Sequence, residues 1–360
     1  MKDIIIVHDF DGRPYFKAIE KNFQCKFINS RPIRFFIRDI VKNRKITKDS
    51  IDSLLFLFLL PFHKNQTIIL GMAPFNFRLL IYGVLCYRNK VLLHSSWHQW
   101  LGKTPFSYIE IFNKILKKLW RHYLPRFVRI IAVTKATKQS ILDFAHPLSL
   151  NIDVIPHVVD IEPITRIELD EKWNSKYIQG LFVGRLTPEK GIKDIIDISK
   201  KMQTGLLKDS NIKIAGKGHL EDDIVHASQN ISVLSYMGYI TSREELRDLM
   251  RQSHFFLLPS KKIKGWEELF GLVIVEAMSQ GCVVIASRHI GPEEIIDDHK
   301  DGILCEESNF IDNTLRNFNN FHMDVSRYKE ISLRALDKSQ KYNMINISRL
   351  WVELINNLER

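Results

Sequence analysis

The sequence has no long hydrophobic run and few cysteines. Its longest apolar stretch, residues 54–62, is about half of the ~20 residues that a membrane-spanning helix needs. The apolar residues 4–7 are too few for a signal peptide and predict a first β-strand. The four cysteines form no C-x-x-C pair and have no metal-ligand spacing with histidine, so we expect reduced thiols in a cytosolic protein.

Several catalytic motifs are also missing. The 13 histidines include no H-E-x-x-H, and the sequence has no G-x-x-x-x-G-K-[ST] phosphate loop and no G-x-S-x-G nucleophile. We find no internal repeat and no low-complexity tract. These absences argue against a zinc protease, a P-loop nucleotidase, a serine hydrolase and a solenoid.

The positive charge lies in one half of the chain. The 360 residues include 52 Lys and Arg against 41 Asp and Glu, a net charge of +11. Residues 1–160 carry a net charge of +14 and residues 161–360 a net charge of −3. A one-sided balance of this kind suggests an anionic partner for the first half, which the charge alone leaves open as a membrane surface, a nucleic acid or a phosphorylated substrate.

Short apolar runs alternate with helical patterns from end to end, which is typical of α/β units with parallel sheets. We expect strands over residues 4–8, 67–70, 91–94, 130–134, 153–155, 178–183, 212–215, 231–234, 255–259, 283–286 and 302–305. Two such series predict two doubly wound domains that face a central cleft. A linker is expected over residues 159–176, and residues 343–360 end in an amphipathic helix.

The segment LFVGRLTPEKG, residues 181–191, combines a strand end, a turn and a helix start. The strand ends at Gly184, and Arg185 and Lys190 place two cations on the following turn. Backbone N–H groups at a helix start favour phosphate, and a bidentate arginine suits a diphosphate. The alternative is an ordinary helix start whose basic residues face water.

The segment EELFGLVIVEAMSQG, residues 267–281, places two glutamates eight residues apart. Glu276 lies inside an apolar run, where an ionised carboxylate needs compensating hydrogen bonds, such as those from the hydroxyls of a ribose. Phe270 and Gly271 precede the predicted helix and would let the backbone approach a ligand closely. The alternative is that Glu276 caps its own helix.

Six segments of the second half follow one another in a recognisable order. They are FVGRLTPEKG, AGKGHLEDDI, SYMGYI, PSKKIKGWEELFGLVIVEAM, SQGCVVIAS and GPEEIIDDHKDGILC. Together they resemble the retaining glycosyltransferases of family 4, which have two Rossmann-like domains in the GT-B fold. The resemblance is close over residues 181–305 and moderate over residues 130–160; before that, only the α/β rhythm matches.

The resemblance implies roles for the donor side. Glu268 and Glu276 match the E-x7-E pair of the family, in which Glu276 would bind the ribose hydroxyls. Glu268 and the backbone of Phe270–Gly271–Leu272 would face the donor sugar and the diphosphate. Arg185 and Lys190 match the pair that neutralises the leaving diphosphate, so neither a divalent metal nor any other cofactor is expected beside the nucleotide-diphosphate sugar.

The remaining candidates come from the same resemblance. Gly216 and Gly238 resemble the turns that flank the nucleotide base. His94, which ends VLLH, resembles the histidine that borders the reacting sugar, and His98 in the same HSSWHQW run is the alternative; either histidine could instead belong to the core. The family usually has a Gly-Gly pair after its first strand, where this sequence has HDFDGRP with Gly12 alone.

Two basic segments of the first half contain apolar residues. Residues 31–45 interleave arginines with phenylalanine and isoleucine, and residues 111–123 predict an amphipathic helix. Its apolar side would be Phe112, Ile115, Leu116, Leu119 and Tyr123, and its basic side Lys114, Lys117, Lys118 and Arg121. Such segments bind anionic lipid surfaces, although they can equally pack on their own domain with solvated lysines. We expect a peripheral membrane contact that high salt releases.

These observations converge on a retaining, metal-independent transferase of the hexosyltransferase type. It would move a sugar from a nucleotide-diphosphate sugar to a saccharide acceptor, often lipid-linked in this family, in surface polysaccharide or lipopolysaccharide assembly. We expect it in the cytoplasm, on the inner face of the cell membrane. Residues 1–165 would bind the acceptor, residues 176–342 the nucleotide sugar, and residues 343–360 would form a helix that packs back on the first domain.

Two other functions were weighed. A sugar-nucleotide epimerase of the same fold would form product without an acceptor and would need a general base, for which no carboxylate–histidine pairing stands out. A nucleic-acid-binding protein would use the basic half, but no DNA or RNA recognition motif is present. We therefore expect no nucleic-acid partner.

Overall fold

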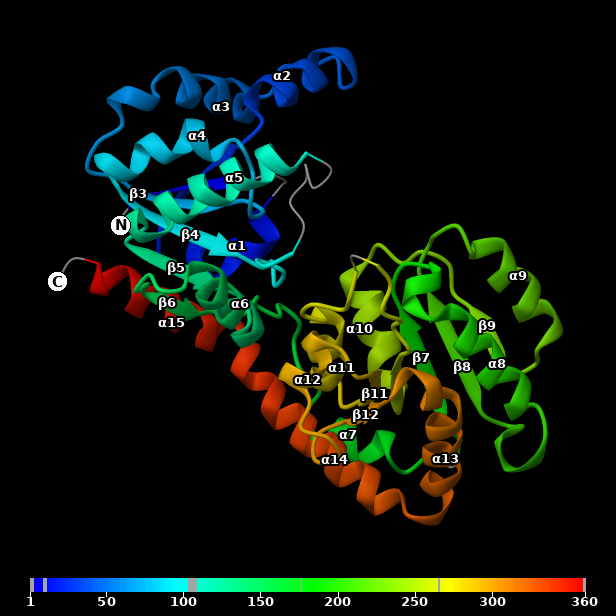
Figure 1. Ribbon diagram of the computed structural model, residues 1–360. Coiled ribbons are helices and arrows are strands. Elements are labelled where there is room, and N and C mark those ends of the chain that lie inside the picture. The colour runs from blue at the N-terminus through cyan, green and yellow to red at the C-terminus, as the bar shows by residue number, and fades with distance from the viewer. Residues whose placement is uncertain (1–2, 9–11, 103–108, 176, 265, 359–360) are drawn as a thin grey trace. The chain divides into compact units, whose positions relative to one another are not determined.

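The computed structural model describes residues 3–8, 12–102, 109–175, 177–264 and 266–358 (Figure 1). The chain forms two compact units, each of which is described by itself. Unit 1 contains Met1–Val158 and Met344–Arg360, and unit 2 contains Val159–Asn343. Each unit is an α/β domain with a six-stranded parallel sheet, as the sequence predicts.

The sheet of unit 1 has the strand order β2-β1-β3-β4-β5-β6. Its strands are β1 (Asp3–His8), β2 (Gln24–Asn29), β3 (Thr67–Gly71), β4 (Lys90–Ser95), β5 (Arg129–Ala132) and β6 (Ile152–Val154). Strand β1 pairs with β2 on one side and β3 on the other, so the order of the strands reverses at β1. In open parallel sheets, ligands bind beyond the carboxyl ends of the strands at this reversal.

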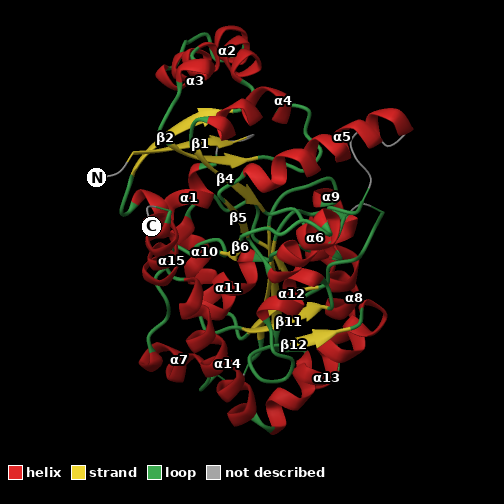
Figure 2. Ribbon diagram, turned by 60° about the vertical axis from the view of Figure 1, so that its left-hand side comes forward, coloured by secondary structure: helices red, strands yellow, loops and turns green. Residues whose placement is uncertain are grey.

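Helices cover both faces of this sheet (Figure 2). They are α1 (Arg13–Glu20), α2 (Pro32–Val41), α3 (Lys48–Phe58), α4 (Leu79–Tyr82), α5 (Glu110–Tyr123), α6 (Lys135–Ala145) and α15 (Met344–Asn357), with 3₁₀ turns η1 (Leu60–Phe62), η2 (Gly83–Tyr87) and η3 (Leu124–Arg126). Side chains of α3 to α6 share one core with the sheet, and those of α1 and α15 share the other. This division follows from strand alternation, since successive side chains point to opposite faces.

The C-terminal helix α15 returns to unit 1, as predicted. Trp351 is 2% exposed within the core that α1 and α15 share. The Ser348 hydroxyl donates a hydrogen bond to the carbonyl of Ala18 (3.0 Å), and Lys90 donates one to the carbonyl of Leu358 (2.6 Å). The last helix therefore completes the hydrophobic core of the first unit.

The sheet of unit 2 has the order β12-β11-β10-β7-β8-β9, with every pairing parallel. Its strands are β7 (Gln179–Val183), β8 (Asn211–Ala215), β9 (Leu234–Tyr236), β10 (Phe255–Leu258), β11 (Val283–Ser287) and β12 (Ile303–Cys305). The first and fourth strands of this unit, β7 and β10, lie side by side, which is the Rossmann order with its reversal between them.

The helices of unit 2 also form two layers. They are α7 (Arg166–Lys172), α8 (Ile192–Met202), α9 (Glu221–Asn230), α10 (Arg243–Gln252), α11 (Leu272–Ser279), α12 (Ile290–Ile295), α13 (Phe310–Met323) and α14 (Val325–Ser339), with 3₁₀ turns η4 (Pro188–Lys190), η5 (Gly205–Leu207), η6 (Glu307–Asn309) and η7 (Gln340–Tyr342). Helices α7, α8, α9, α13 and α14 pack on one face, and α10, α11 and α12 on the other.

Four local predictions differ from the structure. Strand β2 was not predicted, because this edge strand alternates exposed and half-buried residues and carries Lys26. The strand expected over 231–234 starts only at Leu234, since Ile231 closes the last turn of α9 through its N–H. The linker expected over 159–176 contains helix α7, which a capping box at Thr165 initiates. On α5, Leu116 and Trp120 are buried, but the apolar Phe112 and Ile115 are about half exposed.

Candidate functional site

In unit 2, the turn after β7 is fixed against the end of β10. Gly191 follows η4 with a positive φ of 70°, and a Cβ at this residue would lie 1.9 Å from the carbonyl oxygen of Pro259. The Lys261 N–H donates a hydrogen bond to the carbonyl of Glu189 (2.8 Å). The loops that leave the two strands at the topological reversal are therefore held together.

Glycines also bring the ends of β7, β8 and β9 together. Gly216 follows β8 with a φ of +153°, and a Cβ there would lie 1.8 Å from the carbonyl oxygen of Gly184. The Gly216 N–H donates a hydrogen bond to the carbonyl of Gly238 (2.9 Å), which itself has a φ of +72°. The three predicted glycines thus form one backbone contact, which leaves room for a ligand to approach the main chain.

We expect Gly216→Ala to destabilise unit 2 and weaken nucleotide-sugar binding. The new methyl group must displace the Gly184 carbonyl, an overpacking effect of about 2–4 kcal/mol. Gly205→Ala is the matched control, because Gly205 also has a positive φ of 74° but no atom within 4 Å of its Cβ. Its conformational penalty should be about 1 kcal/mol. Urea denaturation and ligand titration of both variants measure the difference; equal losses would contradict a steric role for Gly216.

Lys190 and Glu268 form a nearly buried ion pair. Lys190 lies at the end of η4 and Glu268 in the loop before α11, and their side chains are 14% and 12% exposed. The Ser260 hydroxyl donates a hydrogen bond to the same carboxylate oxygen of Glu268 (3.2 Å). The Lys190 ammonium also lies 5.1 Å from the centroid of the Trp266 ring. Two of the predicted catalytic residues are therefore in direct contact.

The structure does not bring Arg185 to this pair. Its side chain is 61% exposed, and its guanidinium lies 3.5 Å from a carboxylate oxygen of Glu189. The two predicted cations therefore contact different carboxylates: Lys190 is held in place, while Arg185 extends into solvent from the end of β7.

His289 supports the glutamate loop, and the sequence reading did not identify it. The side chain is fully buried; its Nδ1 accepts a hydrogen bond from the Glu268 N–H (3.3 Å) and its Nε2 donates one to the carbonyl of Ser260 (2.9 Å). Gly291, two residues later, donates its N–H to the carbonyl of Glu268 (2.9 Å), and a Cβ there would lie 2.7 Å from the Leu269 backbone. In the sequence, His289 and Gly291 belong to the segment R-H-I-G-P-E-E, and neither residue is predicted to have a role in the site.

Helix α11 starts directly after this loop. Gly271 is its N-cap in the left-handed region (φ 64°), and the Ile274 N–H closes the first turn onto the Gly271 carbonyl (2.7 Å). The N–H groups of Leu272 and Val273 come before this bond and have no partner within the helix, as at every helix start. Phe270 contacts the Tyr342 ring, with centroids 6.2 Å apart. The N-terminal end of α11 thus offers a positive site beside Glu268.

Glu276 lies one turn into α11, half-buried between apolar neighbours. Burial raises the pKa of its carboxyl group, an effect that the nearby Arg243 partly offsets. The described residues provide no hydrogen-bond donor to this carboxylate. Because Gly271 rather than Glu276 occupies the cap position, the alternative that Glu276 caps its own helix does not hold. A half-buried carboxylate without a donor is suited to accept hydrogen bonds from a diol.

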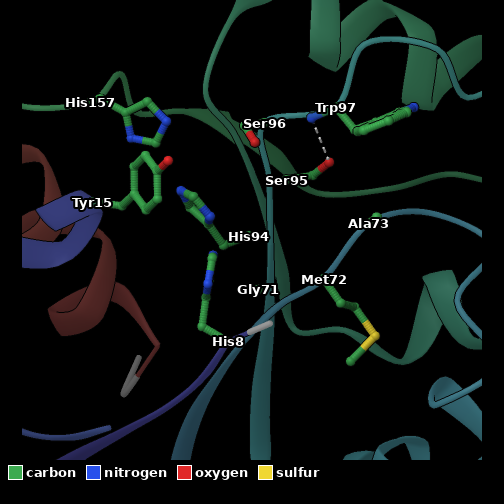
Figure 3. Close-up of a pocket in the computed structure, with 10 residues that line it drawn as sticks. All are labelled: His8, Tyr15, Gly71, Met72, Ala73, His94, Ser95, Ser96, Trp97 and His157. Atoms are coloured by element: carbon green, nitrogen blue, oxygen red, sulfur yellow. Dashed lines mark hydrogen bonds between the residues drawn. The ribbon is translucent and has the colours of Figure 1, made fainter. Parts of the chain in front are cut away.

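In unit 1, a cavity of about 220 Å³ lies at the carboxyl ends of β1, β3 and β4 (Figure 3). The register places His8 opposite Gly71 and Gly71 opposite His94, so the two histidines share one row of the sheet. Figure 3 shows Tyr15 and His157 facing each other beside them, with ring centroids 4.7 Å apart. The predicted residue His94 therefore lies in a wall of imidazole and phenol groups at the reversal of this sheet.

The imidazole of His94 is almost completely enclosed. It is 5% exposed and lies between Phe16 (4.8 Å between centroids) and Trp351 of α15 (6.3 Å). Burial lowers its pKa well below the usual range, and the neighbouring His157 and His8 lower it further. Burial and His8 also lower the pKa of His157 to about 4. Both rings are neutral at physiological pH and can exchange hydrogen bonds with hydroxyl groups.

Gly12 and Gly71 make room for the His8 ring, which the sequence reading did not assign to a site. A Cβ on Gly12 would lie 2.8 Å from Cγ of His8, and one on Gly71 would lie 2.3 Å from its Cδ2. His8 and Gly12 also line a second cavity of about 260 Å³. His98, the alternative to His94, is half-buried and does not line either cavity. Residues 9–11 of the HDFDGRP loop and residue 265 lie outside the described residues.

The described residues form neither a metal-ligand cluster nor a membrane-spanning helix. Across the part of the chain that the structure describes, no three His, Cys, Asp or Glu side chains gather so that they could hold a metal ion. An Asp-x-Asp spacing at Asp9 and Asp11 lies outside that part. Within the described ranges, every helix is too short or too polar to cross a bilayer.

The chain is similar to known glycosyltransferases. Residues 164–320 match the family model described as glycosyl transferases group 1. An uncharacterized glycosyltransferase of Methanocaldococcus jannaschii is 36% identical over 37% of this chain and 35% of its own length. The lipopolysaccharide 1,2-N-acetylglucosaminetransferase of Salmonella typhimurium is 25% identical over 49% of this chain and 48% of its own. The matched regions thus span less than half of these relatives.

Solved structures share the fold over nearly the whole chain. Alr3699/HepE of Anabaena, solved in complex with UDP, superposes with a TM-score of 0.68 and 15% identity, covering 99% of this chain and all of its own. Sucrose-phosphate synthase of Thermosynechococcus elongatus gives the same TM-score at 14% identity and 99% coverage of both chains. Residues 164–320 therefore match the glycosyl transferases group 1, and the two α/β units have the GT-B fold.

Proposed function

We propose that this protein is a retaining glycosyltransferase that uses a nucleotide-diphosphate sugar as donor. The observation that carries the proposal is Glu276, a half-buried carboxylate to which the described residues offer no donor, on the helix whose start adjoins the Lys190–Glu268 pair. This arrangement lies at the topological reversal of unit 2, the position at which Rossmann-type sheets bind nucleotides. A ribose diol on Glu276 would place a diphosphate near the N-terminal end of α11.

The proposed reaction breaks the bond between the anomeric carbon and the diphosphate oxygen. A new bond forms from an acceptor hydroxyl oxygen to that carbon, and the hydroxyl proton is released. Negative charge grows on the departing diphosphate, so groups that bind it more tightly in the transition state accelerate the step. The start of α11, Lys190 and the exposed Arg185 are positive groups at the ends of these strands, and we propose that they act without a divalent metal.

We propose that unit 1 binds the acceptor and that His94 borders the reacting sugar. The cavity lined by His8, His94, His157 and Tyr15 offers a phenol and three imidazoles, of which those of His94 and His157 are neutral. Such groups both donate and accept hydrogen bonds, which suits the hydroxyls of a saccharide. The apolar face of a sugar ring can pack against their aromatic surfaces.

We further propose that the product belongs to a surface polysaccharide or lipopolysaccharide, built on a lipid-linked acceptor at the cytoplasmic face of the membrane. The name of the Salmonella typhimurium relative supports the product class. The net charge of +14 on residues 1–160 supports an anionic surface as partner, and the absence of a nucleic-acid recognition motif disfavours DNA or RNA.

A panel of radiolabelled nucleotide sugars, incubated with lipid extracts and saccharides, tests the proposal. We expect transfer of label to an acceptor with release of the nucleoside diphosphate, unchanged by EDTA. Product formed from the donor without any acceptor would indicate an epimerase instead. Loss of transfer in EDTA, restored by a divalent metal, would overturn the metal-independent part, and inversion at the anomeric carbon would overturn retention.

A further inference from the structure

Helix α3 of unit 1 is apolar on both its inner and its outer side. It buries Ser50, Ser53 and Phe56, and Leu57 packs on the same core. A second apolar stripe faces solvent and consists of Ile51, Leu55 and Phe58, which are 44%, 51% and 72% exposed. A helix on the surface of a water-soluble domain normally has a polar outer side. The exposed stripe therefore requires an explanation other than folding.

Helix α2 also exposes apolar side chains. It buries Pro32 and the charged Asp39, while apolar side chains at helical spacing face outward. The exposed apolar residues are Ile33 (59%), Ile37 (54%), Ile40 (46%) and Val41 (72%). Figure 1 shows α2 and α3 beside each other in unit 1, on the side of the sheet away from α15, and the two helices are in contact.

Hydrogen bonds hold the polar inner sides of the two helices in place. The Asp39 carboxylate accepts hydrogen bonds from the Thr47 hydroxyl and N–H and from the Asn43 amide (2.9 Å). These bonds, first among them the one from the Thr47 hydroxyl, lower the pKa of Asp39. The Ser53 hydroxyl accepts a hydrogen bond from the Asn29 N–H of β2 (3.0 Å). The apolar stripes are thus presented outward by a defined structure rather than by frayed ends.

The apolar surface continues beyond the two helices. Phe62 of η1 is 75% exposed, and Leu80 of α4 is 63% exposed. The Arg88 guanidinium after η2 donates a hydrogen bond to the carbonyl of Pro61 in η1 (3.0 Å), and these two turns are in contact. Exposed apolar side chains gathered on neighbouring elements are typical of interaction sites.

The charge around this surface indicates which partner covers it. Residues 31–62, which contain these elements, carry seven Lys and Arg and three acidic residues, a net charge of +4. A second copy of this chain would bring the same positive charges against them, and like charges oppose such an association. An anionic lipid bilayer offers negative head groups for the basic side chains and acyl chains for the apolar stripes.

We propose that α2, α3 and η1 form a membrane-insertion face, with the stripes of Ile33, Ile37, Leu55, Phe58 and Phe62 entering the acyl boundary of an anionic bilayer. This inference rests on the proposed function, from which it takes the membrane as partner. The sequence predicts a membrane contact that high salt releases. The insertion face combines electrostatic attraction with hydrophobic insertion, so we expect it to hold the protein on the membrane at high salt.

The insertion face adjoins the second cavity of unit 1. Phe35 and Arg38 of α2 line that cavity together with His8, which also lines the first cavity. One helix therefore belongs to both the insertion face and the wall of a polar cavity beside the proposed acceptor site. A membrane-borne acceptor would reach this cavity without leaving the bilayer surface.

Flotation with vesicles tests the insertion face on the full-length chain. Vesicles of equal parts phosphatidylglycerol and phosphatidylcholine are compared at low salt and at about 1 M sodium chloride, where the Debye length falls to about 3 Å. We expect the wild-type protein to stay bound at high salt. The variant Leu55→Gln/Phe58→Gln should bind at least about tenfold more weakly. The control Ile167→Gln/Leu206→Gln removes two apolar side chains of unit 2 that are 73% and 74% exposed and should bind as the wild type does.

Three results would overturn the proposal. The first is complete release of the wild type by salt, and the second is equal vesicle binding by the two double variants. The third is a wild-type dimer, measured by light scattering, that the Leu55→Gln/Phe58→Gln substitution abolishes and the control substitution does not. Sugar transfer from the nucleotide donor is measured on the same samples. A wild-type protein that transfers sugar but does not bind vesicles would reject the insertion face alone, whereas vesicle binding by the wild type without transfer in any of the proteins would reject the proposed function alone.

Discussion

Replacement of Glu276 by glutamine is expected to weaken nucleotide-sugar binding about a hundredfold and to stabilise the ligand-free protein. Hydrogen bonds to a charged group contribute about 1.5–3 kcal/mol each, and the neutral amide loses this strength toward a ribose diol. The amide also removes a half-buried charge that has no donor among the described residues. Function and stability should therefore change in opposite directions, as is common where a site holds an unsatisfied group.

The sign of the stability change depends on pH. Because burial raises the pKa of Glu276, the folded state binds the proton more tightly than the unfolded chain does. The ionised group is therefore unfavourable at neutral pH, and this penalty is relieved as the pH falls through the raised pKa. We expect the melting temperature of Glu276→Gln to exceed that of the wild type at pH 7.5 and the difference to shrink toward acidic pH.

The control for this experiment is Glu244→Gln. Glu244 lies in the first turn of α10 and is exposed, so its replacement removes the same charge without touching the site. Titration with nucleotide sugars and thermal unfolding at several pH values measure both effects. Unchanged nucleotide binding in Glu276→Gln would show that this carboxylate does not hold the ribose.

The buried strands and the segment of residues 267–281 were predictable, because short stretches of sequence are enough to indicate them. The central strands β7, β10 and β11 are continuous apolar runs, as expected for strands covered on both faces. Strand β2 gave no such signal, because an edge strand with exposed positions resembles a loop in its composition. The residues of α3 and η1 read only as an apolar run, since hydrophobicity does not reveal which side of a helix is buried.

The supporting residues of the site depend on contacts between distant parts of the chain. His289 joins Ser260 to Glu268 across two loops, and no spacing in the sequence distinguishes this histidine from the other buried ones. His8 lines the first cavity because Gly71, more than sixty residues later in the chain, is its neighbour in the parallel register. Sequence motifs predict which residues touch ligand, whereas the sheet topology shows which residues lie beside them.

Removal of the Lys190 charge is expected to reduce kcat/KM about 10²–10³-fold if Lys190 neutralises the leaving diphosphate as proposed. Lys190→Met also leaves Glu268 nearly buried with only the Ser260 hydroxyl to compensate its charge, which should destabilise unit 2 by about 3 kcal/mol. Lys193→Met on the exposed side of α8 is the matched control and should change neither quantity.

The double variant Lys190→Met/Glu268→Gln separates catalysis from folding. Replacing both members of a buried ion pair by neutral residues of similar volume is often nearly neutral for stability, so the melting temperature should recover. Transfer should not recover, since neither the cation for the diphosphate nor the carboxylate of Glu268 is restored. A double-mutant cycle in urea and in initial rates measures the two couplings independently. Recovery of the rate along with stability would show that the pair only holds the loop in place, and the role of neutralising the diphosphate would then fall to Arg185 and the start of α11.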